Sequence, residues 1–305
     1  MSNNAVTINE VGPRDGLQSQ SGELSPEQRL QFVEALLAAG LTHIEIGSFV
    51  SPRAVPQMAG TDELARRLAA KAPAAELSAL VPNMRGYENA RAAGVDTVAV
   101  VVSATETMNQ CNINMSLDQT MSVAREVIAR GRDEDASVQA YLAVAFECPF
   151  EGAVDAATVR TQARQLIDAG ASLLVIADTI GAANPAAVNA LMSELAAEHD
   201  SALLACHFHD TRALGLANVY AALEAGIRRF DASIGGLGGC PFAPGARGNV
   251  ATEDVVMLCE QMGFHTGIAL PELLPVIDLI SRMLGREQGG RAVEWLRGRA
   301  VRDAA

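Results

Sequence analysis

The chain has almost no lysine, since Lys71 is the only one in 305 residues. Enzymes that form a Schiff base need a desolvated lysine inside the active site. Lys71 instead belongs to an Ala- and Arg-rich segment of helical composition between two expected strands. The sequence therefore argues against a lysine-dependent aldolase.

Cysteine is scarce and follows no pattern. The five cysteines are scattered, and they form neither an even disulfide framework nor a Cys-x-x-Cys zinc motif. The amino terminus has no basic stretch followed by an apolar one, and no apolar run approaches the roughly 20 residues that cross a bilayer. We therefore expect a cytoplasmic protein that is neither secreted nor inserted in a membrane.

Positive charge is also in short supply. The net charge is -13, with 23 Lys and Arg against 36 Asp and Glu. A nucleic-acid-binding protein needs a basic face, so this class is excluded, and an anionic ligand would need a local cationic pocket. With 49% hydrophobic and 19% charged residues, the composition is that of a globular protein with a sizeable core.

What the chain does have is a regular alternation of β-rich runs with segments of helical composition and crossover length. The expected strands are residues 6–11, 42–49, 77–81, 97–103, 138–146, 173–178, 203–209 and 230–235. The helical segments between them include 25–39, 62–72, 117–130, 156–169, 185–199 and 214–225, and further helices are expected over 251–262, 271–284 and 292–302. This alternation predicts an α/β fold, a (β/α)8 TIM barrel with a C-terminal helical extension.

We expect one domain over residues 1–305, because the sequence contains no linker, repeat or low-complexity tract. Its barrel would occupy about residues 5–250, and its C-terminal helices about 251–305.

Barrel enzymes build their active sites at the carboxyl ends of the strands, and polar residues of this chain gather there. The first strand ends in Arg14 and Asp15, and the second carries Glu45 within an apolar run. A buried carboxylate must be paired, so Arg14 is the expected partner of Glu45. These charges fit either an active site or a structural ion pair.

The seventh strand ends in His207-Phe-His209. Residues i and i+2 share one face of a strand, so both imidazoles point the same way. They would form half of a metal site, or else two hydrogen-bonded core histidines. With Asp15 and Asn249 they would complete a nitrogen and oxygen ligand set suited to Mg²⁺, Mn²⁺ or a similar divalent ion.

Two more features belong to the same end of the barrel. Asp178 closes the sixth strand and could orient a ligand. Residues 235–249 contain six glycines and two prolines around Cys240, which suggests a shaped loop over the site, although a plain connector has a similar composition. Polar loops are expected over residues 110–116 and 147–152.

At these residues the chain closely resembles the 3-hydroxy-3-methylglutaryl-CoA lyase family, one of the metal-dependent acyl-CoA lyases and synthases on a TIM barrel. The matching motifs are residues 11–18, 48–52, 55–58, 112–114, 148–149, 178–181, 207–211, 236–241 and 248–254. They span nearly the whole expected barrel.

The resemblance implies that Asp15, His207, His209 and Asn249 bind the divalent metal, and that Cys240 is the catalytic thiol of a mobile loop. It implies contact of Arg14 with the acyl part of an acyl-CoA substrate. Acidic positions that match Glu45 and Asp178 support the family's site. The implied assembly is a homodimer.

The implied reaction is the cleavage of 3-hydroxy-3-methylglutaryl-CoA to acetyl-CoA and acetoacetate. A lyase of a related substrate such as citramalyl-CoA remains an alternative, as does a condensing acyl-CoA synthase. The chain departs from the family pattern at Arg212-Ala213-Leu214, where Tyr-Gly-Gln is usual, and at Cys111 and Arg247. These departures affect the choice of acyl substrate more than the type of reaction.

Overall fold

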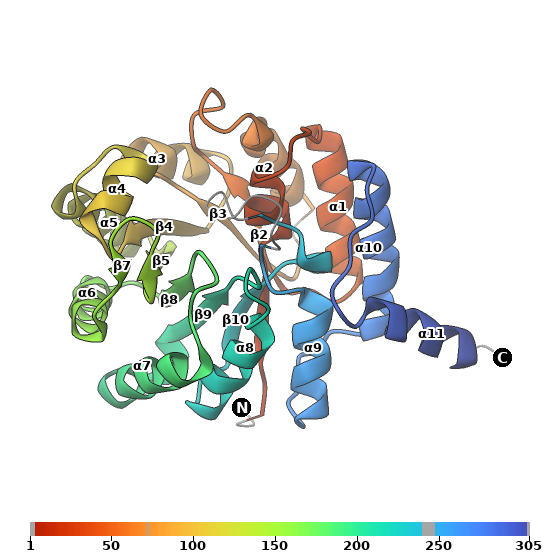
Figure 1. Cartoon of the computed structure of the whole chain (residues 1–305). Helices are drawn as coiled ribbons and strands as arrows, with labels where there is room; N and C mark the ends of the chain where they lie inside the picture. The colour runs from red at the N-terminus through yellow and green to blue at the C-terminus, as the bar shows by residue number, and fades with distance from the viewer. Residues whose placement is uncertain (1–3, 72, 240–247, 304–305) are drawn as a thin grey trace.

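Eight parallel strands close into a barrel in the computed structural model, which describes residues 4–71, 73–239 and 248–303 (Figure 1). Around the barrel the strands run in the order β1-β10-β9-β8-β5-β4-β3-β2. Their bounds are Thr7–Glu10 (β1), His43–Ser48 (β2), Glu76–Leu80 (β3), Thr97–Ser103 (β4), Ser137–Ala143 (β5), Leu173–Asp178 (β8), Leu204–Phe208 (β9) and Arg229–Ala232 (β10). All eight expected strands are therefore confirmed.

Helices surround the barrel, as Figure 1 shows. They are α1 (Pro26–Ala38), α2 (Thr61–Ala69), α3 (Met84–Ala92), α4 (Glu106–Ile113), α5 (Leu117–Asp133), α6 (Ala156–Asp168), α7 (Pro185–Glu198), α8 (Gly215–Glu224), α9 (Thr252–Gln261), α10 (Leu270–Leu284) and α11 (Val293–Asp303). The predicted TIM barrel and its C-terminal helices are both present. The extent of the single domain stays a prediction.

The polar stretch expected as a loop over residues 110–116 is the main error. Residues up to Ile113 belong to α4, which ends at Asn114 in a left-handed conformation with φ 54°. Asn and Cys are weak helix formers, so composition alone hides this helix. The helix α3 was also missed, although the side chain of Asn83 caps it by accepting a hydrogen bond from the amide of Gly86. Between residues 147 and 153, a small hairpin pairs β6 (Glu147–Cys148) with β7 (Gly152–Ala153).

Capping residues fix the starts of two helices, α1 and α5. Ser25 with Gln28 and Ser116 with Gln119 form capping boxes, in which each side chain bonds the other residue's backbone amide. Because barrel helices begin at the carboxyl ends of the strands, these caps lie on the face that carries active sites.

The last helices pack back against the barrel. The helix α9 contacts β1 and α8, and α10 packs along α1 (Figure 1). The segment before α11 returns to the barrel mouth, where the amide of Gly289 donates to the carbonyl of Gly235 over 3.1 Å. Among the helices of the described ranges, none combines the length and apolar character needed to cross a membrane.

We predict that Ala213→Gly stabilises the protein. Ala213 is exposed and holds φ 58°, a left-handed conformation that costs a residue with a Cβ about 1 kcal/mol. Glycine removes this cost, so the free energy of unfolding in urea should rise by roughly 0.5–1 kcal/mol. The matched control is Ala70→Gly, at an exposed helix end with φ -62°, which should lower stability instead. Equal losses in both variants would contradict the prediction.

Candidate active site

A tight turn after β1 places the first two charged residues of the site. The turn is one of π-helix over Gly12–Gly16, and the amide of Gly12 donates to Glu10 Oε1 over 2.8 Å. A Cβ on Gly12 would lie 2.6 Å from the same oxygen, so a larger residue would displace the carboxylate. The turn brings Arg14 and Asp15 over the barrel mouth.

Arg14 holds two carboxylates at once. Its Nε donates to Glu45 Oε2 and its Nη1 to Asp15 Oδ1, each over 2.7 Å. Burial alone would lower the pKa of Arg14, but the two carboxylates outweigh it and raise the pKa. Burial raises the pKa of Glu45 to about 7, against the opposing effect of Arg14. The expected pairing of Arg14 with Glu45 is thus confirmed.

The pKa of Asp15 is shifted downward, in the opposite direction to that of Glu45. Burial favours its protonated form, but the charge of Arg14 and the interactions with His209 and His207 hold the pKa of Asp15 well below its usual range. Asp15 is therefore ionised at neutral pH, as a metal ligand must be.

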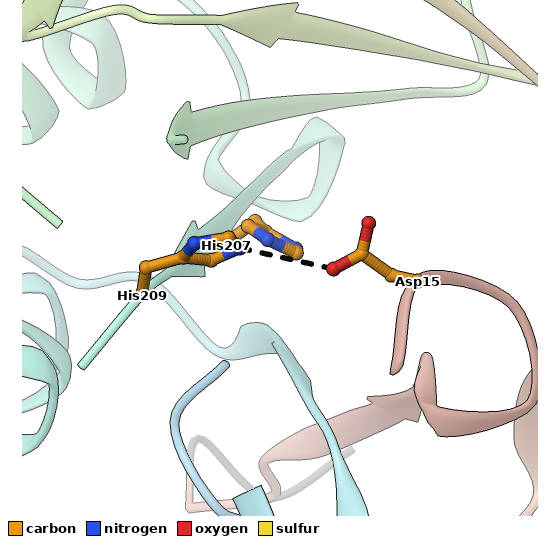
Figure 2. A group of neighbouring side chains, drawn as sticks. All are labelled: Asp15, His207 and His209. Carbon is orange, nitrogen blue, oxygen red and sulfur yellow. Dashed lines mark ion pairs between the residues drawn. The ribbon is translucent and has the colours of Figure 1, made fainter. Parts of the chain in front are cut away.

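Two histidines at the end of β9 face this carboxylate. The rings of His207 and His209 lie with centroids 5.1 Å apart, and both point toward Asp15 (Figure 2). His209 Nε2 lies 3.7 Å from Asp15 Oδ2. The predicted shared orientation of the two imidazoles is confirmed.

The donor atoms are spaced as a divalent ion requires. One ligand atom each from Asp15, His207 and His209 lies within 4.8 Å of the others. Ligands at about 2.0–2.3 Å from a metal lie up to about twice that distance apart, so the three fit one ion. The set mixes one carboxylate with two imidazoles and includes no thiolate.

Asn249 joins the same cluster from the far end of the loop. Its Nδ2 donates to Asp15 Oδ2 over 2.8 Å and to the carbonyl of Leu237 over 3.1 Å. A backbone bridge also pairs His209 with Asn249. Asn249 therefore lies next to Asp15 and His209.

Asp178 shapes the loop after β8. Its two carboxylate oxygens accept hydrogen bonds from the amides of Ala182 (2.8 Å) and Ala183 (3.0 Å). Burial raises the pKa of Asp178, while these amides and the two histidines lower it. Asp178 thus lies near the cluster and holds a turn beside it.

Sequence reasoning missed one buried acid in contact with the cluster. Asp231 on β10 is 4% exposed, and its Oδ2 lies 2.9 Å from His207 Nδ1. Asn9 and Tyr141 also hydrogen-bond the Asp231 carboxylate. The signal was available, because a carboxylate inside a strand has to be paired, as was argued for Glu45.

Sequence reasoning also missed two buried glutamates, Glu10 and Glu253, which anchor the start of the glycine-rich loop. Glu10 accepts from the amide of Ile234 (2.9 Å) and from Thr252 Oγ1 (2.6 Å). Glu253 accepts from the amides of Gly235 (2.9 Å) and Gly290 (2.6 Å). Burial is the main cause that raises the pKa of each glutamate to about 7.

Two residues singled out in the loop, Cys240 and Arg247, lie outside the described residues. Of the other departures from the family pattern, Arg212 is half-exposed and pairs with Glu147 of the hairpin over 3.0 Å. Cys111 is exposed on α4.

The family model described as HMGL-like matches residues 5–280. The chain belongs to the HMGL-like family. It is 43% identical to the hydroxymethylglutaryl-CoA lyase of Pseudomonas mevalonii, over 98% of this chain and 99% of that one. It is also 43% identical to the (R)-citramalyl-CoA lyase of Chloroflexus aurantiacus, over 92% of each.

Solved structures of the HMGL-like family share the fold closely. The crystal structure of the HMG-CoA lyase of Bacillus subtilis superposes with a TM-score of 0.92 at 39% identity, covering 96% of this chain and 98% of that one. The resemblance inferred from the motifs is therefore confirmed.

The raised pKa values of Glu10 and Glu253 predict how stability depends on pH. An acid whose pKa rises from 4.5 to about 7 on folding binds its proton more tightly in the folded state. Its contribution is therefore complete below about pH 4.5 and is lost as the pH rises through about 7. In Glu253→Gln, the fall in the free energy of unfolding between pH 5 and 7.5 should shrink by on the order of 2 kcal/mol.

Urea titrations at both pH values measure this difference. The control is Glu294→Gln on α11, where the glutamate side chain is 82% exposed and should leave the pH dependence unchanged. The same dependence in Glu253→Gln as in the unmodified protein would show that the buried acid is ionised throughout.

Proposed function

We propose that the protein is a hydroxymethylglutaryl-CoA lyase, a carbon-carbon lyase that cleaves 3-hydroxy-3-methylglutaryl-CoA to acetyl-CoA and acetoacetate. The supporting observation is the cluster of Asp15, His207 and His209 beside Arg14, in an HMGL-like chain that matches a lyase of this name over nearly its full length. The reaction is a step of leucine degradation, and its proposed setting is the cytoplasm.

Asp15, His207, His209 and Asn249 would hold a divalent cation, Mg²⁺ or Mn²⁺. When bound, such an ion lowers the pKa of a hydroxyl group and draws the substrate oxygens into place. The ligands themselves are well prepared, since Asp15 is kept ionised and lies within hydrogen-bonding distance of Asn249.

The reaction breaks the bond between C2 and C3 of the substrate. Asp15 accepts the proton of the C3 hydroxyl, because His207 offers one ring nitrogen to the metal and the other to Asp231, and the C2–C3 electron pair moves onto the thioester as an enolate. Arg14 stabilises the charge on the thioester oxygen, a contribution of roughly 3–4 kcal/mol for one oxyanion donor. Glu45 fixes the guanidinium of Arg14 by accepting a hydrogen bond from its Nε.

Cys240 then protonates the C2 carbon to complete acetyl-CoA, while its loop excludes water from the enolate. Asp178 maintains the neighbouring turn. The substrate is an acyl-CoA, no nucleic acid or membrane takes part, and the proposed assembly is a homodimer.

A lyase of citramalyl-CoA is the second candidate. The observation that favours it is the equal identity of 43% to the citramalyl-CoA lyase. Arg212 and Arg247 lie at positions where the chain departs from the family pattern. Their positive charges are therefore the first candidates for residues that change the acyl preference. A condensing acyl-CoA synthase would use the same cluster in the reverse direction.

The substrate is decided by incubating the purified protein with Mg²⁺ and each thioester, and identifying the keto acid released beside acetyl-CoA. We predict acetoacetate from 3-hydroxy-3-methylglutaryl-CoA. Pyruvate alone, released from citramalyl-CoA, would overturn this substrate. Free CoA formed from acetyl-CoA and a keto acid would favour the synthase.

We predict that His207→Ala abolishes metal-dependent cleavage, because it removes one of the clustered ligands. Turnover is measured with and without added Mg²⁺ after treatment with a chelator. Full activity of the variant without metal would contradict the proposed metal dependence.

We predict that Cys240→Ser lowers kcat by at least about 10²-fold, because a hydroxyl is a far weaker acid than a thiol. Metal affinity should stay as in the unmodified protein. Near-normal cleavage by this variant would exclude Cys240 as the proton donor.

A further inference from the structure

Asp231 contacts His207, one of the residues of the candidate metal centre, at its ring nitrogen Nδ1. Its Oδ2 lies 2.9 Å from Nδ1 of His207, and the two residues are register partners on the adjacent strands β10 and β9. Register partners in a parallel sheet point to the same side, so both side chains enter the barrel interior. There Asp231 is 4% exposed and His207 6%.

Asp231 is itself held from two other strands. Asn9 on β1 is its register partner on the opposite side, and Asn9 Nδ2 donates to Asp231 Oδ1 over 2.8 Å. Tyr141 on β5 also hydrogen-bonds the carboxylate, and its ring lies edge-on to His207 with centroids 6.4 Å apart. One row across β1, β10 and β9 therefore connects Asn9, Asp231 and His207.

This arrangement selects one form of the imidazole. A carboxylate oxygen accepts hydrogen bonds, so the 2.9 Å contact with Asp231 favours a proton on Nδ1 of His207. The lone pair is then on Nε2, on the other side of the ring. Since Nδ1 is occupied by Asp231, Nε2 is the atom that His207 can offer to a metal shared with Asp15 and His209.

We propose that Asp231 is a positioning residue that fixes the tautomer and orientation of His207, so that Nε2 is presented to the divalent metal. The proposal rests on the metal site of the proposed function. Asp231 does not touch the metal, but carboxylates behind a histidine ligand typically change metal affinity by about 10- to 100-fold.

The substitution Asp231→Asn separates this role from simple packing, since it preserves the size and shape of the side chain. Asn9 and Tyr141 both remain, and the single oxygen of the new amide stays with these donors. Its NH₂ group then faces His207 Nδ1 and forces the proton onto Nε2. The variant should therefore favour the form of His207 in which Nε2 carries the proton and has no lone pair for a metal.

The test uses the full-length, metal-free protein and Mn²⁺ as the probe. Titration calorimetry should show a Kd for Mn²⁺ that is about 10- to 100-fold higher in Asp231→Asn than in the unmodified protein. In ¹⁵N spectra of the histidine rings, the proton of His207 should move from Nδ1 to Nε2. Neither measurement depends on lyase activity.

The matched control is Asp254→Asn. Asp254 is also 4% exposed, but it accepts hydrogen bonds from the amides of Arg291 and Ala292, away from the histidines. This variant loses a buried carboxylate and should lose stability, yet keep the Kd for Mn²⁺ and the ring form of His207. A Kd raised equally in both variants would show that Asp231 acts through stability alone and would overturn the proposal.

A second variant keeps the test decisive if Asp231→Asn fails to fold. Tyr141→Phe retains the ring beside His207 and removes only the phenol that hydrogen-bonds Asp231. It should raise the Kd for Mn²⁺ by about 2- to 10-fold, less than the full loss of the carboxylate. An unchanged Kd in every variant that folds would overturn the role of Asp231.

The failure of this inference can be told from failure of the proposed function. If the unmodified protein binds Mn²⁺ and cleaves the thioester, while Asp231→Asn keeps the same Kd and ring form, only the role of Asp231 is wrong. If the unmodified protein binds no Mn²⁺, the metal site and everything that depends on it are wrong.

Discussion

The candidate site depends on the contact of one guanidinium with two carboxylates. Removing an ion from water costs several kcal/mol, and Glu45 is completely buried. The planar group of Arg14 meets Glu45 with Nε and Asp15 with Nη1, which compensates both charges in a fixed geometry. A lysine ammonium has three donors, but they lie on one nitrogen at the end of a flexible chain and would not fix the two carboxylates in this planar geometry. The position of Asp15, and through it of any metal, follows from this contact.

The barrel supplies the second constraint, because neighbouring strands of a closed parallel sheet have a set register. Asn9, Asp231 and His207 lie side by side for this reason, although Asn9 and Asp231 are 222 residues apart in sequence. The polar row is thus positioned by the backbone hydrogen bonds of the sheet. Groups held in this way need little reorganisation when charge develops beside them.

The sequence was informative wherever the signal was local. Strand and helix alternation predicted the barrel, the i and i+2 spacing placed His207 and His209 on one face, and a carboxylate in an apolar strand predicted the pair of Glu45 with Arg14. The sequence shows that Asp231 needs a partner, but its partners are set by the register of β10 with β9 and β1, and one partner of Glu253 is set by the C-terminal segment. The helix α4 was missed because tertiary packing outweighs its poor helix propensity.

The return of the C-terminal segment to the barrel mouth limits how the chain can vary. Gly289 and Gly290 satisfy the carbonyl of Gly235 and the carboxylate of Glu253, both buried. A protein shortened after α10 would lose both donors and leave the carbonyl of Gly235 and Oε1 of Glu253 without them, at the base of the glycine-rich loop. Variation in the segment before α11 is therefore constrained by the start of the glycine-rich loop, and a peptide tag at the carboxyl terminus should be joined through a long spacer that leaves these contacts intact.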